Sequence, residues 1–83
     1  MVKVKIYTKD NCPYCIKAKL LFKKYKVNFD EIQIKSQEEK DKLVKMTGWM
    51  TVPQIFINDK FIGGCDDLYK LEEEGKLKSI FSS

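Results

Sequence analysis

Histidine and arginine are absent from this 83-residue sequence, and cysteine occurs only three times. The lack of histidine bears on metal binding, because a structural zinc site needs about four Cys or His ligands. Cys12, Cys15 and Cys65 fall short of that number, so the composition disfavours a zinc centre. The odd number of cysteines also argues against a scaffold held together by disulfide bonds.

Because arginine is absent, all 16 positively charged side chains are lysine, and the net charge is +4. The first 26 residues hold eight lysines and a single acidic residue, Asp10, whereas the remainder holds eight lysines and eleven acidic residues. Lysine lacks the planar fork with which arginine reads bases. We therefore expect a solvated basic face that favours anionic thiol ligands, and no nucleic-acid partner.

Long apolar runs are missing as well. No segment is long enough to cross a membrane as a helix, and the N-terminus begins as an alternating strand pattern rather than as a secretion signal. We therefore expect a cytoplasmic protein without membrane contact, in a reducing compartment where two nearby cysteines are more often catalytic than structural. The length predicts a single domain over residues 1–83 with a modest core.

The sequence Cys12-Pro13-Tyr14-Cys15 is the most informative feature that is present. It stands between a strand-like run and a helical run, so Cys12 is expected at a helix N-terminus, where unpaired N–H groups and the helix dipole stabilise a thiolate. Pro13 suits the first helical turn. Cys15, one turn further, is placed to attack a mixed disulfide formed on Cys12. The spacing favours a redox dithiol over half of a zinc site.

Apolar periodicity and turn residues predict seven elements. Ser36 followed by Glu39 is typical of a capping box that opens a helix, and Gly48 suits its end. The predicted elements are a strand over 2–8, a helix over 13–25, a strand over 27–34, a helix over 37–48, strands over 54–57 and 61–62, and a helix from Asp66 to about Gly75.

This order, β-α-β-α-β-β-α, predicts an α/β fold with a four-stranded mixed sheet and three helices placed on both of its faces. The helix between the first two strands makes them parallel, and the tight turn at Asn58-Asp59-Lys60 makes the last two antiparallel. Cys12 then lies just past the C-terminal end of the first strand, where α/β folds place their ligands.

Three motifs together resemble the signature of dithiol glutaredoxins, in order and in spacing. They are Tyr7-Thr8-Lys9 before the Cys12–Cys15 motif, then Thr51-Val52-Pro53, then Gly63-Gly64-Cys65-Asp66-Asp67-Leu68. The Cys-x-x-Cys spacing alone would fit thioredoxins equally well, but the set is highly specific and spans essentially the whole chain. The resemblance implies a thioredoxin-like (glutaredoxin) fold and a glutathione-dependent thiol–disulfide oxidoreductase.

The resemblance also implies how glutathione is bound. The Thr51-Val52-Pro53 segment looks like a cis-proline loop, which would offer the backbone N–H and C=O of Val52 to the cysteinyl unit. From the residues alone, a trans proline at the start of a strand is as good an interpretation. By analogy, the N–H groups of Cys65 and Asp66, after Gly64, bind the γ-glutamyl carboxylate, and Asp67 binds the amine.

Several other residues have two interpretations. Asp66 could simply cap the last helix, which is compatible with binding. Lys9 is a candidate for the glycine carboxylate of glutathione and for stabilising the Cys12 thiolate, and Lys40 could assist, although solvated surface is the simpler reading. Tyr14 could pack on the tripeptide. For Cys65, a passive half-buried role is favoured over an off-cycle disulfide. The residues assigned to the core are Phe22, Tyr25, Phe29, Phe56 and Leu71.

The implied enzyme holds no metal and no tightly bound cofactor. Glutathione is its co-substrate, NADPH enters indirectly through glutathione reductase, and the partners of the expected monomer are glutathionylated or disulfide-containing proteins. Two alternatives remain open. A thioredoxin-like reductase would be indifferent to glutathione, against which Asp66-Asp67 argues. A glutathione-ligated [2Fe–2S] carrier is the other, and Pro13-Tyr14 with a resolving Cys15 departs from the monothiol pattern of such carriers.

Overall fold

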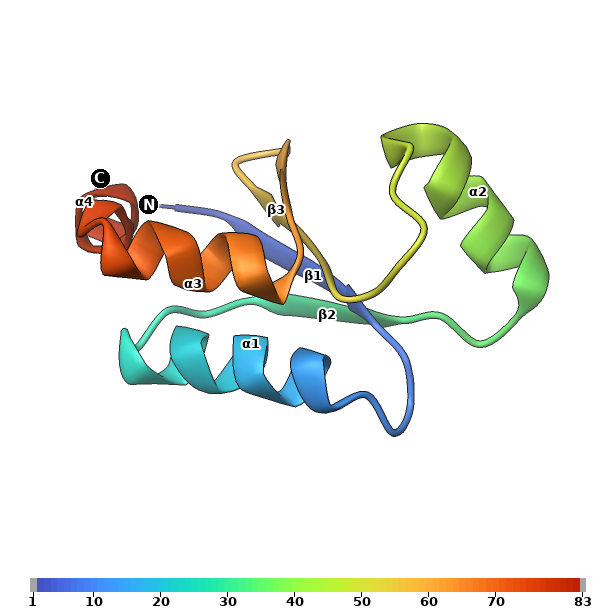
Figure 1. Ribbon diagram of the computed structural model, residues 1–83, viewed down its shortest axis with the longest axis horizontal. Helices are drawn as coiled ribbons and strands as arrows, with labels where there is room; N and C mark the ends of the chain where they lie inside the picture. The colour runs from blue at the N-terminus through green and yellow to red at the C-terminus, as the bar shows by residue number, and fades with distance from the viewer. Residues whose placement is uncertain (1, 83) are drawn as a thin grey trace.

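The computed structural model describes residues 2–82, which form a four-stranded sheet and four helices (Figure 1). In chain order the elements are β1 (Val4–Thr8), α1 (Pro13–Lys24), β2 (Asp30–Gln33), α2 (Gln37–Thr47), β3 (Gln54–Ile57), β4 (Lys60–Gly63), α3 (Cys65–Glu73) and α4 (Lys76–Ser82). None of the helices within residues 2–82 is long and apolar enough to span a membrane.

The strands lie in the order β2-β1-β3-β4. β1 runs parallel to β2, with Lys5 opposite Asp30, and antiparallel to β3, with Ile6 opposite Ile55. β4 returns antiparallel to β3. The predicted mixed sheet, with a parallel first pair and an antiparallel last pair, is therefore confirmed.

Alternation along β1 buries Val4, Ile6 and Thr8 on one face of the sheet, as expected for a strand with one covered face. The apolar core on this face consists of Val4, Ile6, Ala18, Leu21, Phe22, Ile55, Ile57, Leu68 and Leu77. Because these residues come from β1, β3, α1, α3 and α4, the three helices cover the same face of the sheet.

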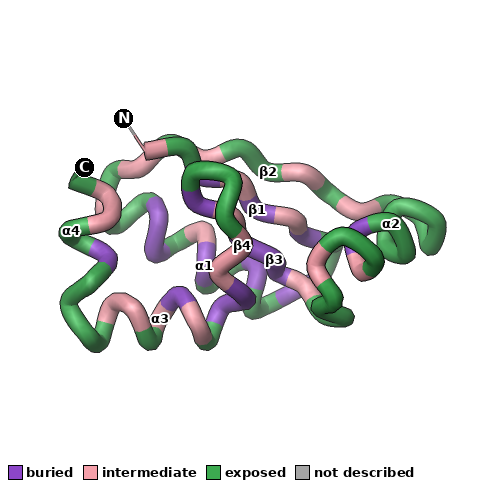
Figure 2. The backbone as a smooth tube through the Cα atoms, turned by 90° about the horizontal axis from the view of Figure 1, so that it is seen from above, coloured by how far each residue is buried: buried purple, intermediate pink, exposed green. Residues whose placement is uncertain are grey.

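The opposite face of the sheet carries α2. Gln54 pairs with Tyr7 in the sheet and so points away from Ile6, and its side-chain oxygen accepts a 2.8 Å hydrogen bond from Thr47 at the end of α2. Leu43 is the one buried residue that α2 contributes, and the helix is otherwise largely exposed (Figure 2). Helices therefore cover both faces, as predicted.

Four of the five predicted core aromatics and aliphatics belong to the main core. Phe22 is fully buried, and Tyr25, Phe29 and Leu71 are half-buried against the cluster. Phe56 instead lies on the α2 face, where its ring centroid is 5.8 Å from that of Tyr7 and 5.3 Å from that of Phe61.

Helices α1 and α3 lie side by side and begin at the same end of the molecule (Figure 1). The Tyr69 hydroxyl donates to the Lys17 carbonyl at 3.1 Å, and one turn or more further along, Lys24 pairs with Glu72 at 2.9 Å. Because α1 and α3 run in the same direction, their N-termini lie at the same end of the sheet, next to the segment that precedes β3.

The predicted limits of α2 are confirmed by its caps. The Ser36 hydroxyl accepts a 3.1 Å hydrogen bond from the Glu39 N–H, which satisfies one of the unpaired donors at a helix start. Gly48 ends the helix in the left-handed conformation with φ +74°, a position that glycine occupies without steric cost.

The predicted number of helices, three, is wrong. After Gly75, the chain forms α4, and its Leu77 is fully buried in the core. A segment of seven residues is too short for a helical period to be recognised, and its stability comes from packing rather than propensity. Phe81 supplies part of that packing, with its ring 5.5 Å from Tyr25.

Several strand limits also differ from the prediction, among them both limits of β4, which spans Lys60–Gly63 rather than 61–62. β1 begins at Val4 rather than residue 2, and β2 begins at Asp30 rather than residue 27. The later start of β2 has a local cause: the Val27 N–H donates to the Phe22 carbonyl, and Lys26 has φ +56°. Val27 therefore belongs to the turn that closes α1 and is not available for strand pairing.

Candidate active site

Cys12 occupies the N-cap of α1, in an extended conformation, with Pro13 in the first helical turn. Its side chain is only 6% exposed. The Cys12 sulfur accepts a 3.3 Å hydrogen bond from the backbone N–H of Cys15. The Cys12 sulfur therefore lies at the start of α1, where the first N–H groups of the helix have no partner within the helix.

Cys15 lies one turn further into the helix and is 2% exposed. Burial, and after it a hydrogen bond with the Cys12 side chain, raises the pKa of Cys15 to about 12. Both cysteines are free thiols. The two sulfurs are therefore neighbours in different surroundings: Cys15 is buried and keeps its proton at neutral pH, whereas the Cys12 sulfur lies at the helix start and accepts the Cys15 N–H.

A cleft of about 970 Å³ lies beside Cys12. It brings the three sequence motifs together, and Cys15 is the one predicted site residue that does not line it. The predicted residues that line it are Lys9, Cys12, Tyr14, Lys40, Thr51, Val52, Pro53, Gly64, Cys65, Asp66 and Asp67.

The Thr51–Pro53 loop forms one wall of the cleft, and its Val52–Pro53 peptide bond is cis, as the resemblance implied. The amide of Gln54 donates to the Thr51 carbonyl at 3.2 Å, which ties the loop to β3. The Val52 carbonyl lies 3.9 Å from the Cys12 sulfur. Within residues 2–82 the Val52 N–H donates to no acceptor, and Val52 lines the cleft.

The N-terminus of α3 forms a second wall. Gly64 is the N-cap, so the alternative in which Asp66 caps this helix is wrong; Asp66 is exposed, in the first turn. One Asp67 oxygen accepts a 3.0 Å hydrogen bond from the Gly64 N–H. A Cβ on Gly64 would lie 3.2 Å from the Pro53 carbonyl, so the absence of a side chain allows this helix end to approach the Pro53 loop.

Cys65, the third thiol, is buried where α3 begins and lines the cleft. Burial, and after it the charge of Asp66, raises the pKa of Cys65, which favours the neutral thiol. Among the described residues, no three Cys, Asp or Glu side chains converge closely enough to hold a metal ion.

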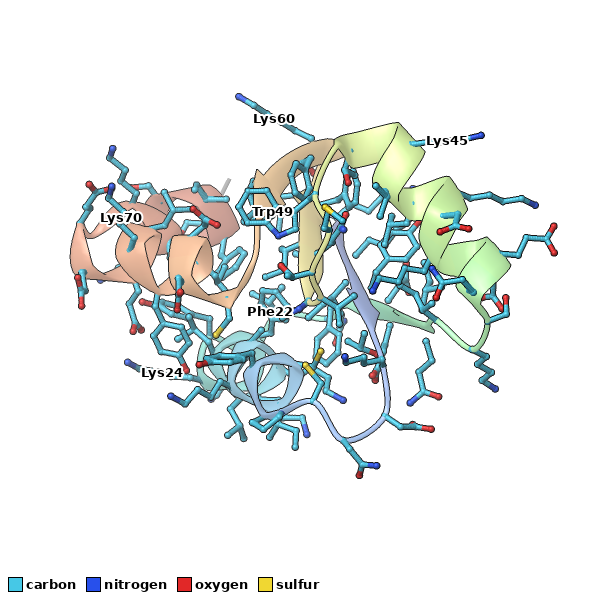
Figure 3. All side chains as sticks on the ribbon, turned by 45° about the vertical axis from the view of Figure 1, so that its right-hand side comes forward. Phe22, Lys24, Lys45, Trp49, Lys60 and Lys70 are labelled. Atoms are coloured by element: carbon cyan, nitrogen blue, oxygen red, sulfur yellow. The ribbon has the colours of Figure 1, made fainter. Side chains whose placement is uncertain are left out.

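Trp49 and Met50 also line the cleft, and the sequence interpretation did not include them. Both are exposed apolar side chains, and Trp49 lies between α2 and α3 (Figure 3). The Trp49 ring packs on Phe61 at 5.6 Å, and its carbonyl accepts a 2.7 Å hydrogen bond from Gln54. Two large apolar residues directly before Thr51 were the available signal, but a loop has no period from which side-chain direction can be read.

Comparison with known proteins identifies the family. A family model described as Glutaredoxin matches residues 4–62. This chain belongs to the glutaredoxin family. Glutaredoxin 1 of Rickettsia prowazekii is 53% identical over 90% of this chain and 82% of that protein. Glutaredoxin 3 of Escherichia coli K12 is 49% identical over 96% of this chain and 98% of that protein.

Solved glutaredoxin structures have the same fold. The solution structure of glutaredoxin from Brucella melitensis has a TM-score of 0.84 at 46% identity, covering 98% of this chain and 89% of that one. A buckwheat glutaredoxin–glutathione complex has a TM-score of 0.87 at 30% identity, covering 95% and 76%. The fold is thioredoxin-like, and membership of the glutaredoxin family implies thiol–disulfide oxidoreductase activity. Cys12 and Cys15 lie close together, which is consistent with a redox-active centre.

Proposed function

We propose that this glutaredoxin is a glutathione-dependent dithiol enzyme that reduces protein–glutathione mixed disulfides and protein disulfides. Cys12 is the nucleophile and Cys15 the resolving thiol. The observation that carries the proposal is the position of the Cys12 sulfur, which accepts the Cys15 N–H at 3.3 Å and lines the cleft formed by the Pro53 loop and the start of α3.

The cleft offers a partner for each polar end of glutathione. The available Val52 N–H suits the backbone of the cysteinyl unit, and Tyr14 flanks it. At the start of α3, the N–H groups of Cys65 and Asp66 suit the γ-glutamyl carboxylate, and the free oxygen of Asp67 suits the γ-glutamyl ammonium. The buckwheat relative, solved as a complex with glutathione, supports this ligand class.

Two lysines complete the proposed binding site. Lys9 and Lys40 line the cleft and are exposed, so either can attract the glycine carboxylate of glutathione. Because lysine is a compact and flexible point charge, it contributes attraction rather than fixed geometry. Gly64, Thr51 and Pro53 contribute the shape of the walls.

With a glutathionylated substrate, the Cys12 thiolate attacks the glutathione sulfur and the protein thiolate leaves, taking up a proton. The thiolate of a second glutathione then attacks the glutathionylated Cys12, which yields glutathione disulfide and regenerates the Cys12 thiolate. NADPH and glutathione reductase return the disulfide to the glutathione pool. The reaction needs no bound cofactor in this chain.

With a protein disulfide, the Cys12 thiolate attacks one substrate sulfur and the other leaves as a thiol. Cys15 then attacks the Cys12 sulfur, which releases the second substrate thiol and leaves a Cys12–Cys15 disulfide, and two glutathione molecules reduce this disulfide and become glutathione disulfide. Two of the causes that raise the pKa of Cys15, the hydrogen bond with Cys12 and the charge of Cys12, depend on a free Cys12 sulfur. Once that sulfur is part of a mixed disulfide, these causes are removed, so the pKa of Cys15 falls at the stage when Cys15 must attack.

We include in the proposal that the enzyme acts as a monomer in the cytoplasm. Its roles there are to maintain cell redox homeostasis and to donate electrons to thiol enzymes.

Single cysteine variants test the assignment. In an NADPH-coupled assay with glutathione and glutathione reductase, Cys12→Ser should lose reduction of both glutathionylated cysteine and oxidised insulin. Cys15→Ser should retain the first activity, which needs one attacking sulfur, and lose the second. Equal loss of both activities in Cys15→Ser would contradict the assigned roles. Full activity without glutathione, sustained by a thioredoxin reductase, would favour the thioredoxin-like alternative.

A further inference from the structure

The outer face of α1 carries an apolar strip that the proposed chemistry does not use. Ile16 is 55% exposed and Leu20 is 56% exposed. Residues four apart on a helix are neighbours on one face, so these two side chains form a continuous surface, which single exposed apolar residues do not. Pro13 is also exposed and connects this surface to Cys12. α1 runs along one border of the molecule (Figure 1).

The strip is flanked by positive charge that the protein does not neutralise. α1 contains four lysines and no acidic residue. Lys19 and Lys24 form ion pairs with Glu31 and Glu72. Within residues 2–82, Lys17 and Lys23 form no ion pair, and both are exposed. The helical period of 3.6 residues places these two lysines on opposite sides of the strip.

The distance from Cys12 decides which substrates can reach the strip. With a rise of about 1.5 Å per residue, Ile16 and Leu20 lie about 6 Å and about 12 Å along the helix axis from Cys12. An extended chain advances about 3.3 Å per residue, so a chain bonded to Cys12 needs about four residues to reach Leu20. Glutathione has a single residue on each side of its cysteine and is too short, whereas a polypeptide substrate is not.

We propose that the α1 strip, formed by Ile16 and Leu20 with Lys17 and Lys23 at its sides, is a docking surface for disulfide-containing protein substrates. The matching segment of the substrate has apolar residues interspersed with Asp or Glu, within several residues of the reacting cysteine. The inference rests on the proposed reduction of protein disulfides. A second copy of this chain fits poorly, because a symmetric contact through this face would bring the unpaired lysines together.

The test compares two substrates on the same variants. The probes are a synthetic peptide with one internal disulfide followed by alternating Leu and Glu residues, and a glutathionylated cysteine that cannot reach the strip. For the Ile16→Ser/Leu20→Ser double variant, kcat/KM toward the peptide should fall about tenfold, because two half-exposed aliphatic contacts are lost. Its kcat/KM toward glutathionylated cysteine should stay within about twofold of wild type. Met46→Ser is the matched control, since Met46 is 61% exposed on α2 and does not line the cleft.

Charge reversal provides an independent readout. Lys17→Glu/Lys23→Glu should lower kcat/KM for the Leu–Glu peptide and raise it for a peptide with Leu and Lys in the same positions.

Two results would overturn the docking surface while leaving the proposed function intact. They are equal losses of kcat/KM on the Leu–Glu peptide and on glutathionylated cysteine, or no loss on the Leu–Glu peptide. If the wild type reduced glutathionylated cysteine but neither peptide, the proposed reduction of protein disulfides would fail first. A wild-type dimer, or binding to phosphatidylserine vesicles, that is lost in the Ile16→Ser/Leu20→Ser variant would reassign the strip to that occupant.

Discussion

One carboxylate oxygen of Asp67 accepts a hydrogen bond from the Gly64 amide, at 3.0 Å, where α3 begins. This bond satisfies a donor that the helix itself leaves unpaired and orients a side chain that also lines the cleft. The second oxygen stays available to a ligand. A single residue therefore stabilises the helix start and presents a negative charge beside the Cys12 cleft.

Substituting Asp67 should separate these two roles. Asp67→Ala removes both, so KM for glutathionylated substrates should rise about tenfold to a hundredfold, because a charged hydrogen bond contributes about 1.5–3 kcal/mol. Asp67→Asn keeps an oxygen for the Gly64 N–H and removes the charge. Asn should therefore raise KM with little change in melting temperature, whereas Ala lowers the melting temperature as well. Unchanged KM in both variants would remove the main reason to prefer glutathione as co-substrate.

Gly63 determines whether Asp67 can keep this position. Gly63 has φ +120°, and a Cβ there would collide with the Asp67 carboxylate. Gly63→Ala should therefore destabilise the fold by more than about 1 kcal/mol and raise KM for glutathionylated substrates by displacing Asp67. Gly75→Ala is the control, because Gly75 also has a positive φ but nothing lies within 4 Å of its added Cβ. It should lower stability, measured by urea denaturation, without changing KM; the same KM in both variants would contradict the displacement.

The thiol of Cys15 should resist alkylation in the reduced protein. Burial, with the hydrogen bond to Cys12, raises its pKa to about 12 from an ordinary value of 9.0, so its reaction rate with iodoacetamide should still be rising at pH 10. In Cys12→Ala the pKa should move downward and remain above 9.0, because burial is the largest cause and persists. Site-resolved mass spectrometry across a pH series measures both. An unchanged Cys15 profile in Cys12→Ala would show that Cys12 does not control the resolving thiol.

An ion pair links α1 to β2 and should make stability depend on acid pH. Glu31 lies 2.9 Å from Lys19 and accepts a 2.7 Å hydrogen bond from Thr8, and these contacts, Lys19 first, lower the pKa of Glu31. Because the folded-state pKa is depressed, the contribution is present above the unfolded value of about 4.3 and is lost as pH falls through the folded value. Glu31→Gln should cost about 0.5–1 kcal/mol at pH 7 and almost nothing at pH 2. Denaturant titrations at both pH values test this, and a pH-independent difference would exclude the ion pair as the cause.

The short helix α4 should be an integral part of the core. Leu77 is fully buried in the apolar core, so Leu77→Ala should lower the free energy of unfolding by about 2–5 kcal/mol. The exposed Lys78, one residue further, is the matched control, and Lys78→Ala should have little effect. A Leu77→Ala variant as stable as wild type would mean that α4 frays from the core in solution.

The sequence by itself determined the features that depend on neighbouring residues. The Cys12–Cys15 spacing predicted two thiols at a helix start, Ser36 and Gly48 predicted the limits of α2, and the order of elements predicted a mixed sheet. These three predictions succeed because capping, periodicity and turn chemistry act over about one helical turn. The family resemblance then predicted which distant motifs share the site.

Only the tertiary structure decided what distant segments do to one another. The seven residues of α4 are a helix because Leu77 is buried in the core and Phe81 packs on Phe22 of α1. The cap of α3 is Gly64, where an added Cβ would lie only 3.2 Å from the Pro53 carbonyl. Trp49 faces the cleft because Gln54 and Phe61 hold it there. Which α1 lysines remain unpaired depends on Glu31 and Glu72, far along the chain. Such contacts depend on packing between segments that lie apart in the chain, and no local periodicity in the sequence predicts them.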